Sequence, residues 1–144
     1  MASTPVAPDM ADPSVGPGRH EARERAIELL YESEARELST VDLLDQLPLT
    51  PNVYAVSAVE GVDGARPQID ALIDEHTEGW SVERLPNVDR AILRLAIWEL
   101  LAQPDVPSAV VIDEAVELAK EYSTERSSSF VNGVLDAVAR TVRG

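Results

Sequence analysis

One segment, residues 87–102 (NVDRAILRLAIWELLA), constrains the fold of this chain more than any other. From Ala91 to Ala102 only Arg94 and Glu99 are polar, and at about 100° per residue these two fall on different sides of a helix. A helix that is apolar nearly all round is typical of a central helix that others surround. The sequence therefore predicts a protein built around this segment.

Both ends of the central helix carry local signals. Pro86 precedes the helix, Asn87 is a suitable N-cap, and Asp89 places a carboxylate in the first turn, where the helix dipole favours negative charge. Pro104 and Pro107 follow it, and proline disfavours helix in the residue before it. The polar exceptions to an apolar interior are Asp89, Arg90, Arg94 and Glu99.

Composition narrows the classes to which the chain can belong. A length of 144 residues allows one domain with a real core, and the absence of cysteine excludes a disulfide framework and a thiolate metal site. No apolar run reaches the ~18 residues of a membrane span, and the start of the chain lacks the features of a secretory signal. We therefore expect a cytoplasmic protein with no membrane contact.

The chain is strongly acidic, with a formal net charge of -14. Phosphate binding needs local positive potential, so this charge argues against nucleic acid as a partner unless a local basic patch exists. It favours either a basic partner or no role beyond solubility.

The rest of the chain divides into a tail and one helical domain. Residues 1–18 are rich in proline and glycine, which predicts a disordered tail. Apolar residues then recur at helical spacing, and no segment has a convincing period of two, so the expected fold over residues 19–144 is all-α. Besides the central helix, we expect helices at residues 19–38, 39–47, 52–64, 67–79, 108–123 and about 127–142. A capping box at Ser39–Asp42 supports the second of these, whereas Gly61 weakens the third.

A basic cluster lies near the start of the first helix. Arg19, His20 and Arg23 have no obvious acidic partner one turn ahead. Basic side chains beside the free N–H groups of a helix start can hold a phosphate, and plain surface charge is the alternative explanation.

Phe130 is the only phenylalanine in the chain and follows Arg126 and three serines at the start of the last helix. An aromatic ring beside hydroxyls and an arginine suits stacking on an unpaired base. The alternative is that Phe130 simply anchors the last helix in the core.

Catalytic patterns are missing from the sequence. It has no G-x-S-x-G motif, no phosphate-binding loop and no glycine-rich dinucleotide turn. His76 has no second histidine nearby, and the acidic stripe Glu114, Glu117 and Glu121 is typical of a solvated helix face. We therefore expect no enzymatic activity, no cofactor and no metal site.

Four segments together resemble the transcription antitermination factor NusB family. They are RHEARERAIELLYE, GWSVERLPNVDRAILRLAIWELL, VVIDEAVELAKEYS and SFVNGVLDAV, and the resemblance spans about residues 19–140. It implies about seven helices in two small bundles that share the N-terminal helix. NusB-like domains also precede RNA methyltransferase domains, but the chain ends at Gly144 with no cofactor-binding domain after it, which supports the expectation of a non-enzymatic protein.

The resemblance also implies a function. A NusB-type protein binds the boxA element of ribosomal RNA operon leader transcripts together with a small ribosomal protein that acts as NusE. That pair helps to assemble an antitermination complex on RNA polymerase. A basic ribosomal partner would explain the acidity of the chain. A protein-interaction module that binds a basic partner without touching RNA is the alternative, and a homodimer stays possible.

Site residues follow from the resemblance by position. The implied partner-binding residues lie at the supposedly exposed start of the central helix and are Glu83, Asp89 and Arg90. Glu21 and Glu24 interrupt the arginine run that the family often carries, which predicts weak RNA binding by the isolated protein. Gly133 is expected to permit a close backbone approach, and Asn132 to hold a neighbouring helix end. The implied RNA-binding residues are Arg19, His20, Arg23, Tyr31, Arg126, Ser127 and Phe130.

Overall fold

The computed structural model describes residues 19–144, which form seven α-helices and one 3₁₀ helix, with no strand among them. The expected all-α class is therefore confirmed, and the tail expected at residues 1–18 lies outside the described residues. In chain order the elements are α2 (Arg19–Ala35), α3 (Thr40–Gln46), α4 (Val53–Gly64), α5 (Arg66–His76), η1 (Val82–Arg84), α6 (Asn87–Ala102), α7 (Ser108–Tyr122) and α8 (Glu125–Arg143).

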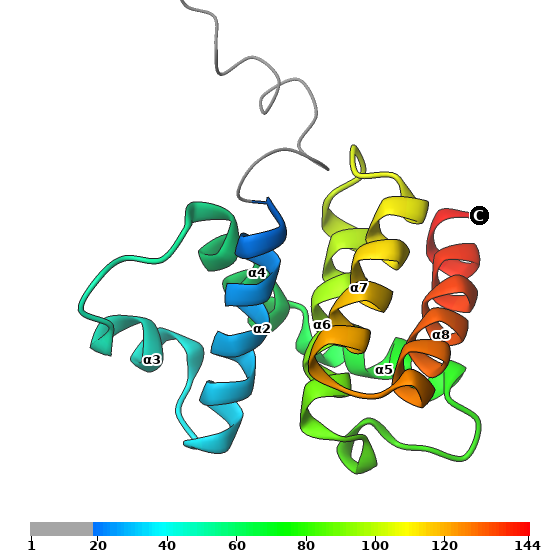
Figure 1. The fold of residues 1–144 in the computed structure, drawn as a ribbon, viewed down its shortest axis with the longest axis horizontal. Coiled ribbons are helices and arrows are strands. Elements are labelled where there is room, and N and C mark those ends of the chain that lie inside the picture. The colour runs from blue at the N-terminus through cyan, green and yellow to red at the C-terminus, as the bar shows by residue number, and fades with distance from the viewer. Residues whose placement is uncertain (1–18) are drawn as a thin grey trace, which may run out of the picture.

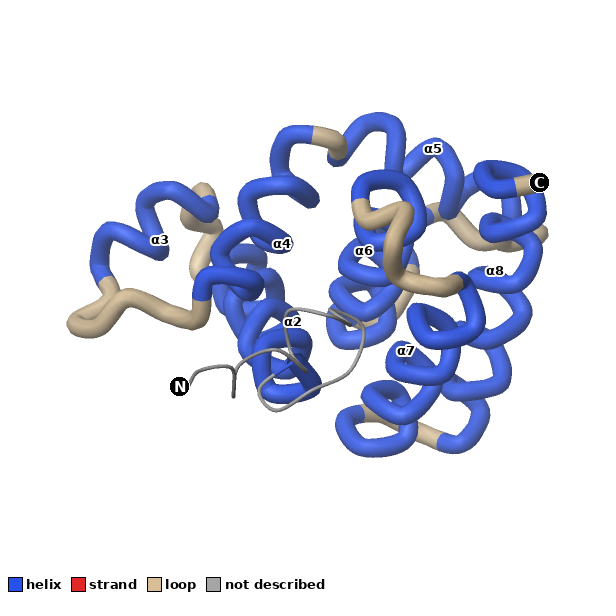
Figure 2. Tube along the Cα trace, turned by 90° about the horizontal axis from the view of Figure 1, so that it is seen from above, coloured by secondary structure: helices blue, strands red, loops and turns tan. Residues whose placement is uncertain are grey.

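The helices form two groups, which Figures 1 and 2 show side by side. Helices α3 and α4 pack with α2, while α5, α7 and α8 surround α6. Helix α2 also packs against α6, so it joins the two groups as expected. The central helix has the wider set of neighbours, because α6 contacts α2, α4, α5, α7 and α8.

Burial along α6 agrees with its apolar sequence. Every residue from Asp89 to Leu100 is buried, including the four polar exceptions. Neither this helix nor any other described helix has the length and hydropathy that a membrane-spanning helix requires.

Helix starts were predicted well where a short polar side chain precedes the helix. The Ser39 hydroxyl accepts a hydrogen bond from the backbone N–H of Asp42, and Asn52 caps α4 in the same manner. The expected cap at Asn87 is wrong. Pro86 holds the N-cap position, and the Asn87 side-chain oxygen accepts instead from the guanidinium of Arg90.

The close backbone approach that was expected at Gly133 occurs at Gly61 instead. A Cβ atom at Gly61 would lie 1.9 Å from Nε1 of Trp98, so α4 needs a glycine there to pack against α6. At Gly133 a Cβ atom would meet nothing within 4 Å, and neighbouring Asn132 is exposed, so the expected close approach is wrong. Glycine has a low helix propensity, and at Gly61 this cost is offset by the close packing of Trp98.

Candidate functional site

Arg23 is a core residue, and its expected exposure on an RNA surface is wrong. The side chain is 1% exposed, and its Nε donates to both oxygens of Glu99 on α6, at 3.2 and 3.1 Å. Nη1 also donates to Glu114 on α7 at 3.3 Å. The acidic partners of Arg23 therefore come from two distant helices, which a search one turn away in the sequence cannot find.

A network of polar side chains surrounds this buried pair. The Tyr54 hydroxyl donates to Glu99, and Nη2 of Arg23 lies 3.0 Å from the same carboxylate without the alignment of a hydrogen bond. Burial opposes the charged form of Arg23, but the Glu99 carboxylate more than offsets it and raises the pKa of the guanidinium. Burial and Glu99 together raise the pKa of Tyr54. Arg23 thus stays charged but is not available to bind a phosphate.

The two other members of the basic cluster have neighbours as well. His20 is 41% exposed and lies within 3.7 Å of Glu24, Glu114 and Glu121. Its hydrogen bond to Glu114 raises the pKa of His20 above the ordinary value, and burial opposes the change less strongly. The guanidinium carbon of Arg19 lies 3.8 Å from the centre of the Tyr54 ring. The start of α2 is therefore a balanced ionic region rather than a basic patch.

Three side chains that could bind a cation lie close together at the start of α2 and the end of α7. Ligand atoms of His20, Glu24 and Glu121 lie within 4.8 Å of one another. The buried guanidinium of Arg23, which is paired with Glu114 beside them, adds positive charge and disfavours a cation there.

Arg126, Ser127 and Phe130 come together with Asp89 in a pocket of about 260 Å³. The pocket lies between the start of α6 and the start of α8, and its remaining walls are Trp80, Leu85 and Pro86. Three of the expected RNA-binding residues therefore share one hollow. Sequence analysis missed Trp80, because the 55% exposure of its indole becomes known only from the structure.

The expected exposure of the start of the central helix is wrong. Asp89 is 3% exposed and Arg90 is 7% exposed, and only Glu83 of the expected partner-binding residues is exposed. Arg90 donates from Nε to Glu34 on α2 at 3.0 Å and from Nη1 to the carbonyls of Val82, Glu83 and Leu85. Its role in this structure is to hold the η1 segment against α2.

Glu34 forms ion pairs with two guanidinium groups, those of Arg90 and Arg94. Burial raises its pKa, but the hydrogen bond and charge of Arg90 outweigh that and lower it. This second network, in which Arg90 and Arg94 are buried and Glu34 is partly exposed, also joins α2 to α6.

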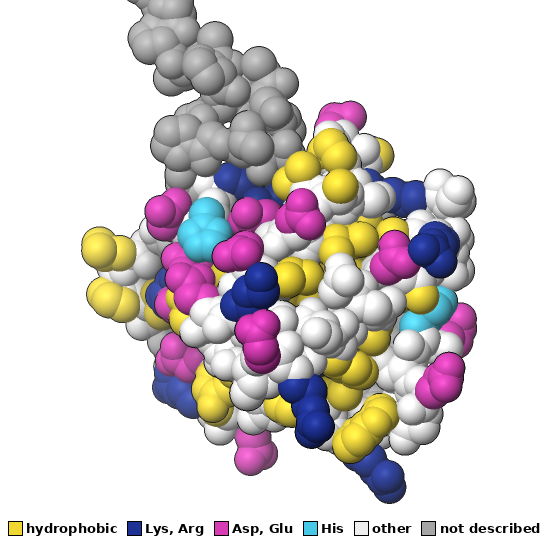
Figure 3. All heavy atoms as spheres, turned by 45° about the vertical axis from the view of Figure 1, so that its right-hand side comes forward, with side chains coloured by type: hydrophobic (Ala, Val, Ile, Leu, Met, Phe, Trp, Pro, Cys, Tyr) yellow, Lys and Arg dark blue, Asp and Glu magenta, His cyan; other side chains and the backbone are white. Residues whose placement is uncertain are grey.

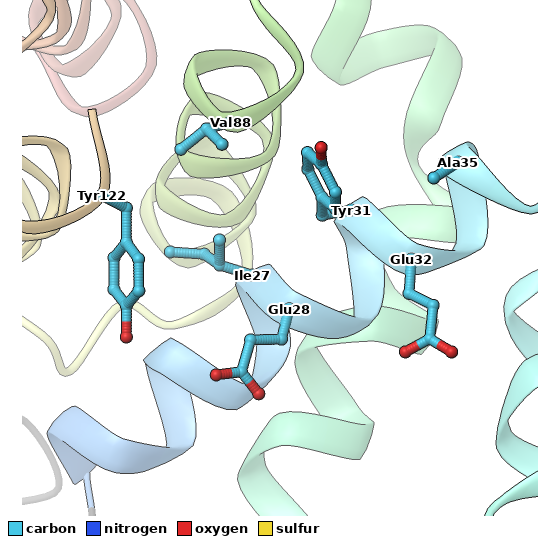
Figure 4. Close-up of a pocket in the computed structure, with 7 residues that line it drawn as sticks. All are labelled: Ile27, Glu28, Tyr31, Glu32, Ala35, Val88 and Tyr122. Carbon is cyan, nitrogen blue, oxygen red and sulfur yellow. The ribbon is translucent and has the colours of Figure 1, made fainter. Parts of the chain in front are cut away.

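Tyr31 lies in a separate groove of about 380 Å³ on α2. Figure 4 shows Tyr31 and Tyr122 on either side of Ile27, with the carboxylates of Glu28 and Glu32 on the same stretch of α2. A hydrogen bond to Glu24 raises the pKa of Tyr122 to about 12. The structure thus places Tyr31 apart from the pocket that Phe130 lines.

Charge is mixed on the face of the molecule that Figure 3 shows. On the face in Figure 3, basic side chains are scattered singly among acidic and apolar ones. No continuous basic surface lies on that face, in keeping with the net charge of -14.

Comparisons with known proteins assign the chain to a family. The NusB family model matches residues 20–140. The chain is similar to NusB of T. maritima, with 38% identity and a TM-score of 0.76 over 84% of this chain and 89% of that one. It is also similar to the solution structure of NusB from Aquifex aeolicus, with 30% identity and a TM-score of 0.70, over 87% of this chain and 89% of that one.

A third similar structure is a crystal structure of the antitermination factors NusB and NusE in complex with double-stranded RNA. The identity is 29% and the TM-score 0.74, over 85% of this chain and 96% of that one. Because the family model spans nearly all of the described helices and the T. maritima protein matches in both sequence and fold, this chain belongs to the NusB family.

Proposed function

We propose that this chain is an RNA-binding transcription antitermination factor that recognises boxA RNA of ribosomal RNA operons together with a NusE-type small ribosomal protein. The observation that carries the proposal is its similarity, over 96% of the other chain, to a structure of NusB and NusE with RNA. The pair acts as part of an antitermination complex on RNA polymerase.

The pocket at the start of α8 is the part of the surface best suited to RNA. Phe130 and Trp80 offer aromatic faces, and Arg126, which is exposed, brings a positive charge to the same place. Base stacking with a nearby guanidinium is the usual basis of binding to unpaired RNA. Arg19 and His20 stay candidates for phosphate contacts, and Arg23 does not, because it is buried.

The Tyr31 groove suits the protein partner better than RNA. Glu28 and Glu32 line it beside Tyr31, and two carboxylates repel a phosphate backbone. An apolar floor with an acidic rim fits a basic ribosomal protein. Glu83, exposed near the start of α6, is the remaining partner-binding candidate.

A fluorescence anisotropy titration tests the proposal. Labelled boxA RNA and a scrambled RNA of equal length are titrated with the full chain, alone and with the ribosomal partner. We expect weak binding by the chain alone and a clear gain for boxA when the partner is present. If the partner brings no gain over scrambled RNA, the proposed function is wrong.

A second candidate function is a protein-interaction module that binds a basic partner without contacting RNA. The net charge of -14 and the burial of Arg23 favour it. It predicts that the chain binds the partner but leaves the affinity of the partner for boxA RNA unchanged, which the same titration measures.

A further inference from the structure

Asp89 stands out among the buried polar groups. Its carboxylate is 3% exposed, and Oδ2 accepts a hydrogen bond from the Ser127 hydroxyl at 2.9 Å. Oδ1 has no donor among the described residues. A buried carboxylate oxygen without a protein donor is able to accept a hydrogen bond from a ligand in an adjoining pocket.

Asp89 lines a pocket in which such a ligand can lie. Its walls are mostly apolar, with Trp80 and Phe130 as the two aromatic side chains. Its volume of about 260 Å³ is just below the roughly 300–1,000 Å³ of sites for larger organic ligands, so it suits a single planar ring system. Among the described residues that line the pocket, Asp89 is the one carboxylate and Arg126 the one cation.

We infer that this pocket binds one unpaired RNA base, and that the base carries an exocyclic amino group which donates to Oδ1 of Asp89. The base packs against Trp80 and Phe130, and its phosphate lies near Arg126. This inference rests on the proposed function and deepens it, because it names the kind of base that the site selects.

The occupant follows from the charges that line the pocket. A lysine or arginine from a protein partner could also donate to Asp89, but it would bring a second cation beside Arg126. A nucleotide offers a neutral donor edge and an anionic phosphate in one ligand, which matches the carboxylate and the guanidinium together.

The identity of the base follows from its hydrogen-bonding edge. Cytosine, adenine and guanine each present an amino group, and carboxylates accept from the amino group of cytosine in known complexes. Uracil flanks its single N–H with two carbonyl oxygens, which a carboxylate repels. The pocket therefore selects against uracil.

The test exchanges the donor and acceptor roles. With the full chain and its ribosomal partner, boxA RNAs that carry uracil in turn at each position that normally bears an amino base are compared by anisotropy. Wild-type protein should lose roughly tenfold in affinity at one position. Asp89→Asn offers an amide N–H, so it should lose or reverse that preference at this position alone.

Two further variants keep the result interpretable. Asp105→Asn makes the same change of charge at an exposed loop residue and should leave the base preference unchanged. Trp80→Ala removes a half-exposed ring without touching the core, and should weaken binding of intact RNA but not of RNA that is abasic at the selected position.

Each outcome decides the inference. An equal change at every position for Asp89→Asn is a charge effect and overturns the base pocket. Loss of the ribosomal partner without any change in base preference assigns the pocket to a protein side chain and also overturns it. If wild-type protein and partner bind boxA RNA no better than scrambled RNA, the proposed function itself is wrong.

Discussion

The two basic sites at helix starts look alike in the sequence and differ in the structure. At the start of α2, Arg23 is enclosed and neutralised by Glu99 and Glu114 from other helices. At the start of α8, Arg126 is exposed beside an apolar pocket and a carboxylate with an unpartnered oxygen. The first site stabilises the junction between the two groups of helices, and the second is still able to bind a ligand. A basic residue near a helix start is therefore a candidate for ligand binding only where it is exposed.

The largest expected effect tests the structural role of Arg23. Arg23→Ala should lower the free energy of unfolding by about 3–5 kcal/mol, because it leaves Glu99 charged and buried without its partner. Urea denaturation followed by circular dichroism measures this. Arg25→Ala, a change at a partly exposed residue two positions away, should alter stability by less than about 0.5 kcal/mol. A loss below about 1 kcal/mol for Arg23→Ala would contradict its assignment to the core.

The fold was largely predictable because helical periodicity and caps are local properties. The apolar run of α6 indicated its central position, and the capping signal at Ser39 indicated the start of α3. Pairings between helices are not local. The contacts of Arg23 with Glu99, and of Arg90 with Glu34, join residues more than fifty positions apart. Both arginines were expected at the surface and are buried in the structure.

The candidate site was predictable only in part, for the same reason. Arg126, Ser127 and Phe130 are close in the sequence and were found together, whereas Trp80 and Asp89 reach the pocket from other segments. The family resemblance placed Asp89 correctly at the start of α6 but gave no sign of its burial or its unpartnered oxygen.

The next prediction separates the two explanations of Phe130. Phe130→Leu keeps an apolar side chain against the core but removes the ring, so stability should fall by less than about 1.5 kcal/mol. Loss of stacking on one base should weaken boxA binding by about 1–3 kcal/mol. Equilibrium unfolding and the RNA titration are run on the same variant. Unchanged RNA affinity together with lower stability would make Phe130 a core anchor only.

A smaller effect is expected for Arg126. Arg126→Ala should leave unfolding unchanged within about 0.5 kcal/mol, since the residue is exposed. It should weaken RNA binding for all sequences and reduce the slope of log affinity against log salt by about one. Arg140→Ala, which removes an exposed arginine in the last turn of the same helix, is the control and should not change the slope. An unaltered slope for Arg126→Ala would remove it from the RNA surface.

The smallest effect tests whether the ionic region at the start of α2 responds to pH. The pKa of His20 is raised above the ordinary 6.5 by its hydrogen bond to Glu114. Protonated His20 therefore stabilises the folded state, fully below pH 6.5 and progressively less as the pH rises through the raised pKa. Because the side chain is 41% exposed and screened by solvent, the effect should be only a few tenths of a kcal/mol.

His20→Gln should thus cost more stability at pH 6 than at pH 8, and added salt should reduce the difference. The matched variant His76→Gln replaces a histidine whose hydrogen bonds go to the Leu72 carbonyl and the Thr141 hydroxyl rather than to carboxylates. Its cost at pH 6 should change less with added salt, because its hydrogen-bond partners are uncharged. An equal salt dependence in the two variants would mean that the acidic residues around His20 do not stabilise its charge. The charges at the start of α2 would then pair less strongly than their distances indicate. The difference from the exposed Arg126 at the α8 pocket would be correspondingly smaller.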